Sequence, residues 1–349
     1  MSQGIDFSCP LPHPANGVIT LAHGGGGSVM HRLLEDCFLP AFHNPLLEQE
    51  LDATPITIGG TQLAFTTDSF VVRPLFFPGG NIGSLAVYGT VNDLAMQGAR
   101  PLYLSAAFVL EEGLPLEMVQ RVVRAMAEAA HETGVTIATG DTKVIERARG
   151  EELIINTAGI GVIESPWGLG PQAVRSGDAI IVSGDLGRHG IAVMAVREGL
   201  EFEQSIDSDL APLAEPVLRL LYQGIELHCL RDLTRGGLAS ALNELAVKSG
   251  YTFHIEEDLV PVREEVRGAC EVLGLDPLYV ANEGRFVAFL PDAHVSCALD
   301  LLTKAMPGTG PACIGHVLPE RKSWVSIETA IGATRVLDML SGEQLPRIC

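Results

Sequence analysis

The sequence predicts a two-domain protein of the mixed α/β class, and three observations support this prediction. The 349 residues correspond to about two domains at ~150 residues per domain, each large enough to bury its own core. Apolar residues make up 47% of the chain and charged residues 19%, which is typical of a folded protein and excludes a disordered one. Apolar runs typical of strands alternate with helical patterns, as in sheets covered by helices.

The expected elements of the first half follow from local patterns. The clearest is a helix over 115–132, because Val119, Val122 and Met126 share one face and Gly134 supplies a stop signal. The other expected helices are 29–43 and 82–97. The expected strands are 17–22, 61–67, 101–110, 135–139 and 153–163.

A domain boundary is expected at 164–178, where Gly, Pro and Ser interrupt the periodicity. The second half then alternates strands and helices, which predicts a second layered α/β domain. Its expected strands are 179–183, 251–255, 285–290 and 311–317, and its expected helices are 189–199, 209–223, 237–248, 262–273 and 293–305. We therefore divide the chain into an N-terminal extension, a first domain, a linker, a second domain and a tail. These are residues 1–16, 17–163, 164–178, 179–338 and 339–349.

Charge and composition exclude several function classes. The formal net charge is −20, and no basic block interrupts the chain, so a nucleic-acid partner is not expected. No apolar run approaches the ~18 residues of a membrane span, and the first residues do not have the pattern of a signal peptide. The seven cysteines are scattered without a C-x-x-C pair, which argues against a disulfide framework. We expect a cytoplasmic protein that does not contact a membrane.

The motifs of several common enzyme classes are also missing. The sequence has no G-x-x-x-x-G-K-[ST], so a P-loop is excluded, and no G-x-G-x-x-G that opens a helix. It has neither H-E-x-x-H nor G-x-S-x-G, so zincin and α/β-hydrolase chemistry are unsupported.

Five short acidic turns remain, each at the end of an apolar element. Alone, each aspartate is explained as a turn former or helix cap. Together they favour a Mg²⁺ site that holds nucleotide phosphates, because hard oxygen ligands on several loops are what Mg²⁺ requires. The turns are Thr67-Asp68-Ser69, Val91-Asn92-Asp93-Leu94, Thr139-Gly140-Asp141-Thr142-Lys143, Arg231-Asp232-Leu233-Thr234-Arg235-Gly236-Gly237 and Ala281-Asn282-Glu283-Gly284-Arg285.

Two glycine-rich segments offer backbone amides to phosphates. The first is His23-Gly24-Gly25-Gly26-Gly27-Ser28, and the second is Gly236-Gly237 at the start of an expected helix. A flexible loop explains the first segment equally well, and His23 alone is explained by packing. Lys143 is the first lysine of the chain and follows an acidic turn. It has the charge to meet a phosphate or shuttle a proton, and a salt bridge to Asp141 is the simpler interpretation.

The printed sequence ends in Cys349, after a segment in which Pro346 forbids a helix. About seven extended residues at ~3.3 Å each reach roughly 23 Å, enough to carry the thiol into a neighbouring site. A chance terminal cysteine is the alternative.

Taken together, these motifs resemble the HypE family of hydrogenase maturation proteins. The resemblance covers residues 17–349. It rests on LAHGGGG (21–27), FTTDSFVV (65–72), FFPGGNIG (76–83), VNDLAMQGARP (91–101), VLEEGLP (109–115), TGDTKV (139–144), RDLTRGG (231–237), ANEG (281–284) and PRIC (346–349). A more distant resemblance is to aminoimidazole ribonucleotide synthetase, selenophosphate synthetase and thiamine monophosphate kinase. It implies their two-domain architecture, in which the β-sheet of the N-terminal domain dimerises and the C-terminal domain is layered α/β.

The resemblance implies that the protein is an ATP-dependent carbamoyl dehydratase. A carbamoyltransferase, HypF, would load Cys349 with a carbamoyl group, and ATP-dependent dehydration would convert it to a thiocyanate. The cyanide would pass to iron on a HypC–HypD scaffold for [NiFe]-hydrogenase. The implied cofactors are ATP and Mg²⁺, and the implied assembly is a homodimer.

The resemblance also implies roles for individual residues, with Cys349 carrying the group and either Lys143 or Glu283 acting as the base. The implied metal ligands are Asp68, Asp93, Asp141 and Asp232. The implied nucleotide-binding residues are His23, Gly24, Gly25, Gly26, Gly27, Asp68, Asn92, Asp93, Asp141, Thr142, Gly236 and Gly237.

Two other functions fit the same residues. In one, Cys349 is a non-catalytic carrier and ATP is a conformational signal. In the other, the protein is a small-molecule kinase or synthetase and the tail is incidental.

Overall fold

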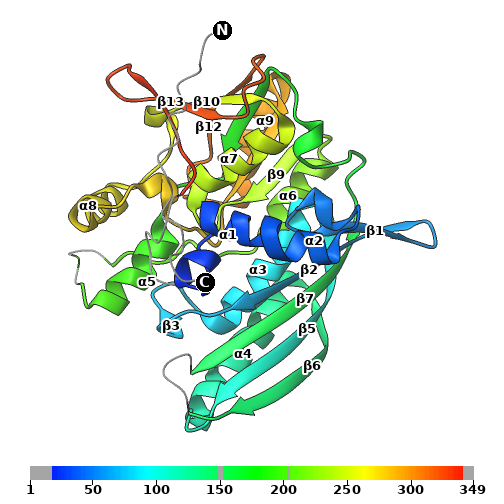
Figure 1. Ribbon diagram of the computed structural model, residues 1–349, viewed down its shortest axis with the longest axis vertical. Helices are drawn as coiled ribbons and strands as arrows, with labels where there is room; N and C mark the ends of the chain where they lie inside the picture. The colour runs from blue at the N-terminus through cyan, green and yellow to red at the C-terminus, as the bar shows by residue number, and fades with distance from the viewer. Residues whose placement is uncertain (1–17, 148–151, 201, 203–204, 341–349) are drawn as a thin grey trace.

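The computed structural model describes residues 18–147, 152–200, 202 and 205–340 (Figure 1). The expected N-terminal extension and the terminal Cys349 lie outside the described residues. Two sheets form the frame of the molecule. The strands of the first fall within residues 54–163 and those of the second within residues 178–336.

The first sheet has five strands in the order β1-β2-β7-β5-β6. Neighbours are antiparallel except β5 and β6, which are parallel and joined by a helix, as a parallel pair requires. The strands are β1 (Thr54–Ile58), β2 (Thr61–Phe70), β5 (Ala99–Glu111), β6 (Thr136–Ile145) and β7 (Leu153–Ile163); β3 (Phe76–Phe77) and β4 (Gly80–Asn81) form a separate small hairpin.

Two helices accompany this sheet, and both match the expectation. Helix α3 (Ile82–Met96) is apolar around most of its circumference, and it is buried between the first sheet and the second half of the chain. The Asn81 side chain caps it by accepting hydrogen bonds from the first turn. Helix α4 (Leu116–Thr133) is amphipathic and ends at Gly134, whose φ of 70° is left-handed.

The second sheet has seven strands in the order β14-β13-β10-β12-β8-β11-β9. Only the β10–β13 pair is parallel among them. The strands are β8 (Asp178–Val182), β9 (Cys229–Asp232), β10 (Thr252–Glu256), β11 (Phe286–Pro291), β12 (Ala312–Leu318), β13 (Val325–Glu328) and β14 (Thr334–Val336).

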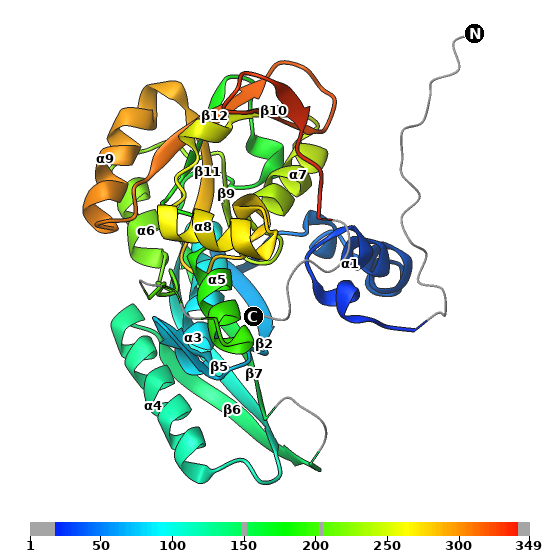
Figure 2. The same ribbon diagram turned by 90° about the vertical axis from the view of Figure 1, so that its left-hand side faces the viewer.

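Helices cover both faces of the second sheet (Figure 2). Successive residues of β8 point to opposite faces, so Ile181 joins the core under α6 and α9 while Ile180 and Val182 pack with α7. This layered arrangement confirms the predicted mixed α/β class. The helices of this half are α5 (Arg188–Glu198), α6 (Ala214–Tyr222), α7 (Gly237–Ser249), α8 (Glu264–Leu273) and α9 (Val295–Ala305).

The N-terminal segment is helical, and the strand predicted at 17–22 is wrong where the structure describes it. A 3₁₀ turn covers Leu21–Gly24 because the Thr20 carbonyl accepts the His23 amide at 3.1 Å. The predicted helix at 29–43 is confirmed as α1 (Ser28–Leu33), a π-helical turn (Leu34–Phe38) and α2 (Leu39–Phe42).

Three of the predicted turns are also wrong: residues 91–94 lie inside helix α3, and the other two lie inside strands. Strand β2 continues through Asp68 to Phe70 because it pairs with β7 along this stretch. Strand β6 continues through 140–143 to Ile145 because it pairs with β5. In both places long-range pairing overrides the local preference of Gly, Asp and Thr for turns.

Within the part of the chain that the structure describes, no helix is long and apolar enough to cross a membrane.

Candidate active site

Three aspartates from distant parts of the chain converge where the two sheets meet. Asp52 precedes β1, Asp93 lies on α3, and Asp232 ends β9. One carboxylate oxygen from each lies within 4.8 Å of the others. Helix α3 packs against both β2 and β9, and this packing brings the three side chains together. Sequence analysis expected Asp93 and Asp232 in a metal site, and the structure places them side by side.

Asp68 and Glu283 extend the group, which we call the acidic cluster: Asp52, Asp68, Asp93, Asp232 and Glu283. The charge of Asp68 raises the pKa of Asp93, Asp232 and Glu283, so Asp68 lies in the same neighbourhood as these carboxyls. The cluster therefore joins residues from four of the five predicted acidic turns, together with Asp52.

Burial is the main reason why the pKa values of the cluster carboxyls are raised. It raises the pKa of Asp52 to about 6, and repulsion from Glu244 adds to the shift. Burial and the neighbouring aspartates raise the pKa of Asp93, Asp232 and Glu283 well above the ordinary range. Carboxyls are costly to ionise here without a cation, and oxygen donors at this spacing fit Mg²⁺.

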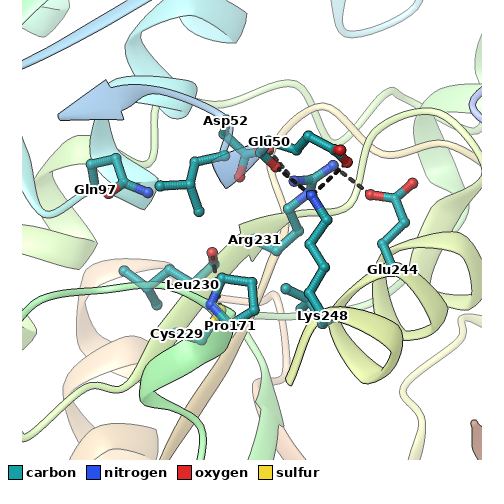
Figure 3. A pocket seen from close by; sticks show the side chains of 11 residues that line it. Glu50, Asp52, Gln97, Pro171, Cys229, Leu230, Arg231, Glu244 and Lys248 are labelled. Carbon is teal, nitrogen blue, oxygen red and sulfur yellow. Dashed lines mark hydrogen bonds and ion pairs between the residues drawn. The ribbon is translucent and has the colours of Figure 1, made fainter. Parts of the chain in front are cut away.

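Arg231 pairs with the edge of the cluster that lies beside the second sheet. Its guanidinium group lies 3.0 Å from Asp52 and 2.7 Å from Glu244, as Figure 3 shows. Lys248 pairs with Glu50 at 2.6 Å on the same wall of this small cavity. Glu244 also bonds His31 at 3.0 Å, which raises the pKa of His31. This network connects helix α1 to the cluster through α7.

Glu283 is buried, and its Oε1 has no hydrogen-bond partner among the described residues. Its backbone is fixed, because the Asp209 carboxylate accepts the amides of Glu283 and Gly284 at 2.7 and 3.2 Å. Asn92 donates to the Glu283 carbonyl at 3.3 Å and accepts the Leu213 amide at 2.7 Å. Asn92 on α3 is therefore hydrogen-bonded to the second half of the chain. The family resemblance implied a nucleotide contact at this position.

Thr66 orients Asp93. Its hydroxyl donates to Asp93 Oδ2 at 2.8 Å. This bond fixes the orientation of the Asp93 carboxylate, whose neighbours are Asp52 and Asp232.

The glycine-rich segments lie next to each other beside the cluster. Arg235 donates to the Gly24 carbonyl at 3.3 Å, and its charge lowers the pKa of Asp68 and Asp232 against the effect of burial. Gly236 caps α7 and Gly237 begins it. His23 bonds Thr20 through Nδ1 at 3.0 Å.

Asp141, Thr142 and Lys143 lie apart from the cluster of their own chain. They are on β6, and the register runs from Ser69 through Asn156 and Ala107 to Asp141. Three strand spacings of ~4.8 Å put the Asp141 backbone about 14 Å from β2. All ten residues of β6 are exposed. Lys143 pairs with Asp141 at 3.0 Å, which is the salt bridge considered as the simpler interpretation.

Sequence analysis missed three charged residues of the site. Asp52 precedes the short strand β1, which local patterns did not reveal, so nothing marked it as a ligand. Arg231 and Arg235 lie in the same motif as Asp232, from which only the aspartate was predicted to belong to the site. The two arginines on either side of this aspartate could have indicated that positive charge accompanies it.

Comparisons with known proteins agree with this architecture. A family model for the N-terminal domain of AIR synthase related proteins matches residues 51–163, and the corresponding C-terminal model matches residues 175–326. The chain is 48% identical over 334 residues to "Carbamoyl dehydratase HypE" of Azotobacter vinelandii, covering 96% of this chain and 98% of the relative. It is 45% identical over 336 residues to the Escherichia coli protein of the same name, covering 95% and 99%.

A solved structure described as hydrogenase maturation protein HypE in complex with ATP matches with a TM-score of 0.80 and 47% identity. The match covers 95% of this chain and all of that one. A structure described as a HypE–HypF complex matches with a TM-score of 0.83 and 43% identity, covering 88% of this chain and 99% of the matched chain.

Proposed function

Because this chain belongs to the HypE family of carbamoyl dehydratases, we propose that it converts an S-carbamoyl group on Cys349 into a thiocyanate at the expense of ATP. The family match over nearly the whole chain is the observation that carries this function. The cyanide group would then serve as an iron ligand of [NiFe]-hydrogenase.

The reaction removes one oxygen and two protons from the carbamoyl group. Its oxygen attacks the γ-phosphate of ATP, which turns a poor leaving group into phosphate, and ADP departs. The two N–H protons are removed one after the other, each passing through the base to solvent. The C–O bond breaks, and the carbon is left triply bonded to nitrogen. The products are the thiocyanate, ADP and phosphate.

The acidic cluster is the proposed Mg²⁺ site, with Asp52, Asp68, Asp93 and Asp232 as ligands. When bound, Mg²⁺ offsets the charge that develops on the transferred phosphoryl group. The proximity of three carboxylate oxygens within 4.8 Å and the raised pKa of the aspartates support this assignment. Arg231 and Arg235 supply fixed positive charge on the cluster's two sides.

Glu283 is our first candidate for the base. Its buried Oε1 has no partner among the described residues. Burial, then the charge of Asp232, raises its pKa, so this carboxylate binds a proton more tightly than an exposed glutamate does. Lys143 is the second candidate, and it reaches a cluster only from another copy of the chain, because its own cluster lies three strands away.

We therefore propose a homodimer in which β6 of each copy faces the other. Strand β6 is the edge of its sheet, and Ile137, Val144 and Ile145 are exposed on it. Long apolar edge strands are usually covered in folded proteins. In such a dimer Asp141, Thr142 and Lys143 belong to the nucleotide site of the partner. Their predicted roles as metal ligand, nucleotide contact and base can then be tested by mixing variants.

The proposed partners are a carbamoyltransferase of the HypF type and a HypC–HypD iron scaffold. The solved HypE–HypF complex of a relative supports the first. Because the reaction consumes ATP, we also propose that the protein acts in the cytoplasm.

Intact mass spectrometry tests the function. The protein is incubated with the carbamoyltransferase, carbamoyl phosphate, Mg²⁺ and ATP. We expect a carbamoyl adduct on the C-terminal peptide that then loses one water. An adduct that never loses water would favour the carrier function, and full activity on a free substrate without Cys349 would favour a small-molecule kinase.

A further inference from the structure

The last described residue of the chain is held by the glycine-rich segment. The Ser28 amide donates a hydrogen bond to the Leu340 carbonyl at 3.1 Å. Leu340 itself is buried. Cys349 follows Leu340 by nine residues. The glycine-rich segment is therefore in direct contact with the start of the segment that carries the reactive thiol.

Gly27 leaves no room for a side chain at this contact. A Cβ there would stand 2.4 Å from the Leu340 carbonyl oxygen, closer than any real Cβ contact. The backbone torsions of Gly27, φ −116° and ψ −170°, are open to every residue, so the contact and not the torsion requires glycine. At Gly24 and Gly25 a Cβ would meet nothing closer than 3.6 Å.

The same contact is tied to the acidic cluster through Arg235. A Cβ on Gly26 would stand 2.8 Å from the Arg235 Cβ, and the Arg235 guanidinium group donates to the Gly24 carbonyl. The charge of Arg235 also acts on Asp232 and Glu283. One arginine thus contacts the segment that holds Leu340, and its charge also acts on the groups that would perform the reaction.

The residues just before Leu340 are held from the other side. Asn243 on α7 donates to the Leu337 carbonyl at 2.9 Å, and the Tyr279 hydroxyl donates to the Asp338 carbonyl at 2.8 Å. The position of Leu340 is therefore fixed by both halves of the chain.

We propose that Gly27 and Ser28 form a socket for Leu340 that positions the Cys349 segment for dehydration. Gly27 and Ser28 are positioning residues, and the proposal rests on the proposed function. Nine extended residues at ~3.3 Å each reach at most about 30 Å. Anchoring Leu340 on Gly27 and Ser28 keeps the thiol within that radius of the glycine-rich segment, which raises its effective concentration there.

Two pairs of variants test the socket. Gly27→Ala fills it, and Gly268→Ala on the exposed face of α8, where a Cβ meets nothing within 4 Å, is the matched control. Ser28→Pro removes the amide donor at the first residue of α1, where proline is tolerated. Ser28→Ala keeps that amide and deletes a hydroxyl without a partner among the described residues.

The first readout is a single turnover of the carbamoylated protein, with ATP affinity measured separately. We expect Gly27→Ala and Ser28→Pro to slow thiocyanate formation at least about tenfold while ATP affinity stays within about twofold. Gly268→Ala should keep the wild-type rate, and Ser28→Ala, which keeps the amide, should lose less of that rate than Ser28→Pro. Unchanged rates in the first two variants would overturn the socket. An equal loss of ATP affinity in Gly25→Ala and Gly27→Ala would overturn it too, because the segment would then be a phosphate cradle.

The second readout does not depend on activity. Hydrogen exchange of the Ser28 amide in the uncarbamoylated protein should be slow in the wild type and in Gly268→Ala, and fast in Gly27→Ala. Fast exchange in the wild type would overturn the socket. If the wild type forms no thiocyanate but protects this amide, the proposed function fails while the contact stands.

Discussion

Arg231 and Asp52 form an ion pair at 3.0 Å, although burial raises the pKa of the Asp52 carboxyl to about 6. The pair connects the two sheets. Arg231 lies on β9, an edge strand of the second sheet, and Asp52 precedes β1, an edge strand of the first sheet. Arg231 also holds Glu244 at 2.7 Å, so its single charge is shared between two acids. Because one arginine charge serves two acids, the carboxylates of the acidic cluster outnumber the positive charges that pair with them. A divalent cation would balance this excess negative charge.

The first prediction concerns pH and Mg²⁺. Burial raises the folded-state pKa of Asp52 from its ordinary value of 3.8 to about 6, so the metal-free protein binds this proton more tightly than the unfolded chain. Its contribution to the free energy of unfolding is present below about pH 4 and is lost as the pH rises through about 6. Mg²⁺ should therefore raise the melting temperature more at about pH 7.5 than at about pH 5.5.

Thermal melts with and without Mg²⁺ at both pH values measure this difference. Asp52→Asn should reduce it, while Asp258→Asn, at an exposed carboxyl of the same charge, should not. A Mg²⁺ shift that is equal at both pH values would remove Asp52 from the metal site.

The second prediction concerns Asp93. Asp93→Asn should lower ATP-dependent turnover at least about 100-fold, because a ligand charge is lost at the transferred phosphoryl group. It should not lower the melting temperature of the metal-free protein, since it relieves repulsion from Asp232 and Asp52. Thr66→Val should cause a smaller loss, about 10-fold, because Thr66 only orients Asp93. Steady-state phosphate release measures both, and wild-type turnover in Asp93→Asn would contradict the assignment.

The third prediction concerns Arg231. Arg231→Gln should lower the free energy of unfolding by about 3 kcal/mol, because Asp52 and Glu244 then lack their shared partner in a buried setting. The control is Arg219→Gln, which breaks a surface pair with Glu215 within one helix and should have little effect. Urea unfolding of both variants provides the comparison. Equal stabilities would show that the Arg231 pairs contribute no more than surface pairs.

The fourth prediction concerns Lys143 and the dimer. Lys143→Ala and Asp93→Asn should each be inactive alone. If Lys143 serves the partner's cluster, an equal mixture after subunit exchange should regain about a quarter of wild-type activity, because half of the dimers carry one intact site. No recovery after confirmed exchange would place Lys143 with its own chain's cluster or outside the reaction.

Local patterns predicted the elements whose signals are local. Helix α4 was recognised by its apolar face and by Gly134, and α3 by its long apolar run. Six strands were missed, because they are short and exist through pairing: β1, β3, β4, β9, β13 and β14. Phe253 on β10, for example, meets Val325 on β13 across a long stretch of sequence. A prediction from neighbouring residues alone cannot detect a pairing between residues this far apart in the sequence.

The site divides in the same way. Asp93 and Asp232 were found because they stand in recognisable motifs, and the structure brings them together. Asp52 was not found, since its place in the cluster depends on how β1 pairs with β2 and meets Arg231. Asp141 and Lys143 share a motif with the other acids in the sequence but lie three strands away in the fold.

In the proposed reaction ATP activates the carbamoyl oxygen on Cys349, and an isotope experiment follows that oxygen atom. The tail is loaded with a carbamoyl group whose oxygen is the heavy isotope, ATP and Mg²⁺ are added, and the released phosphate is weighed by mass spectrometry. We predict that the heavy oxygen appears in phosphate, one atom for each thiocyanate formed. Heavy oxygen released as water, with unlabelled phosphate, would contradict the account.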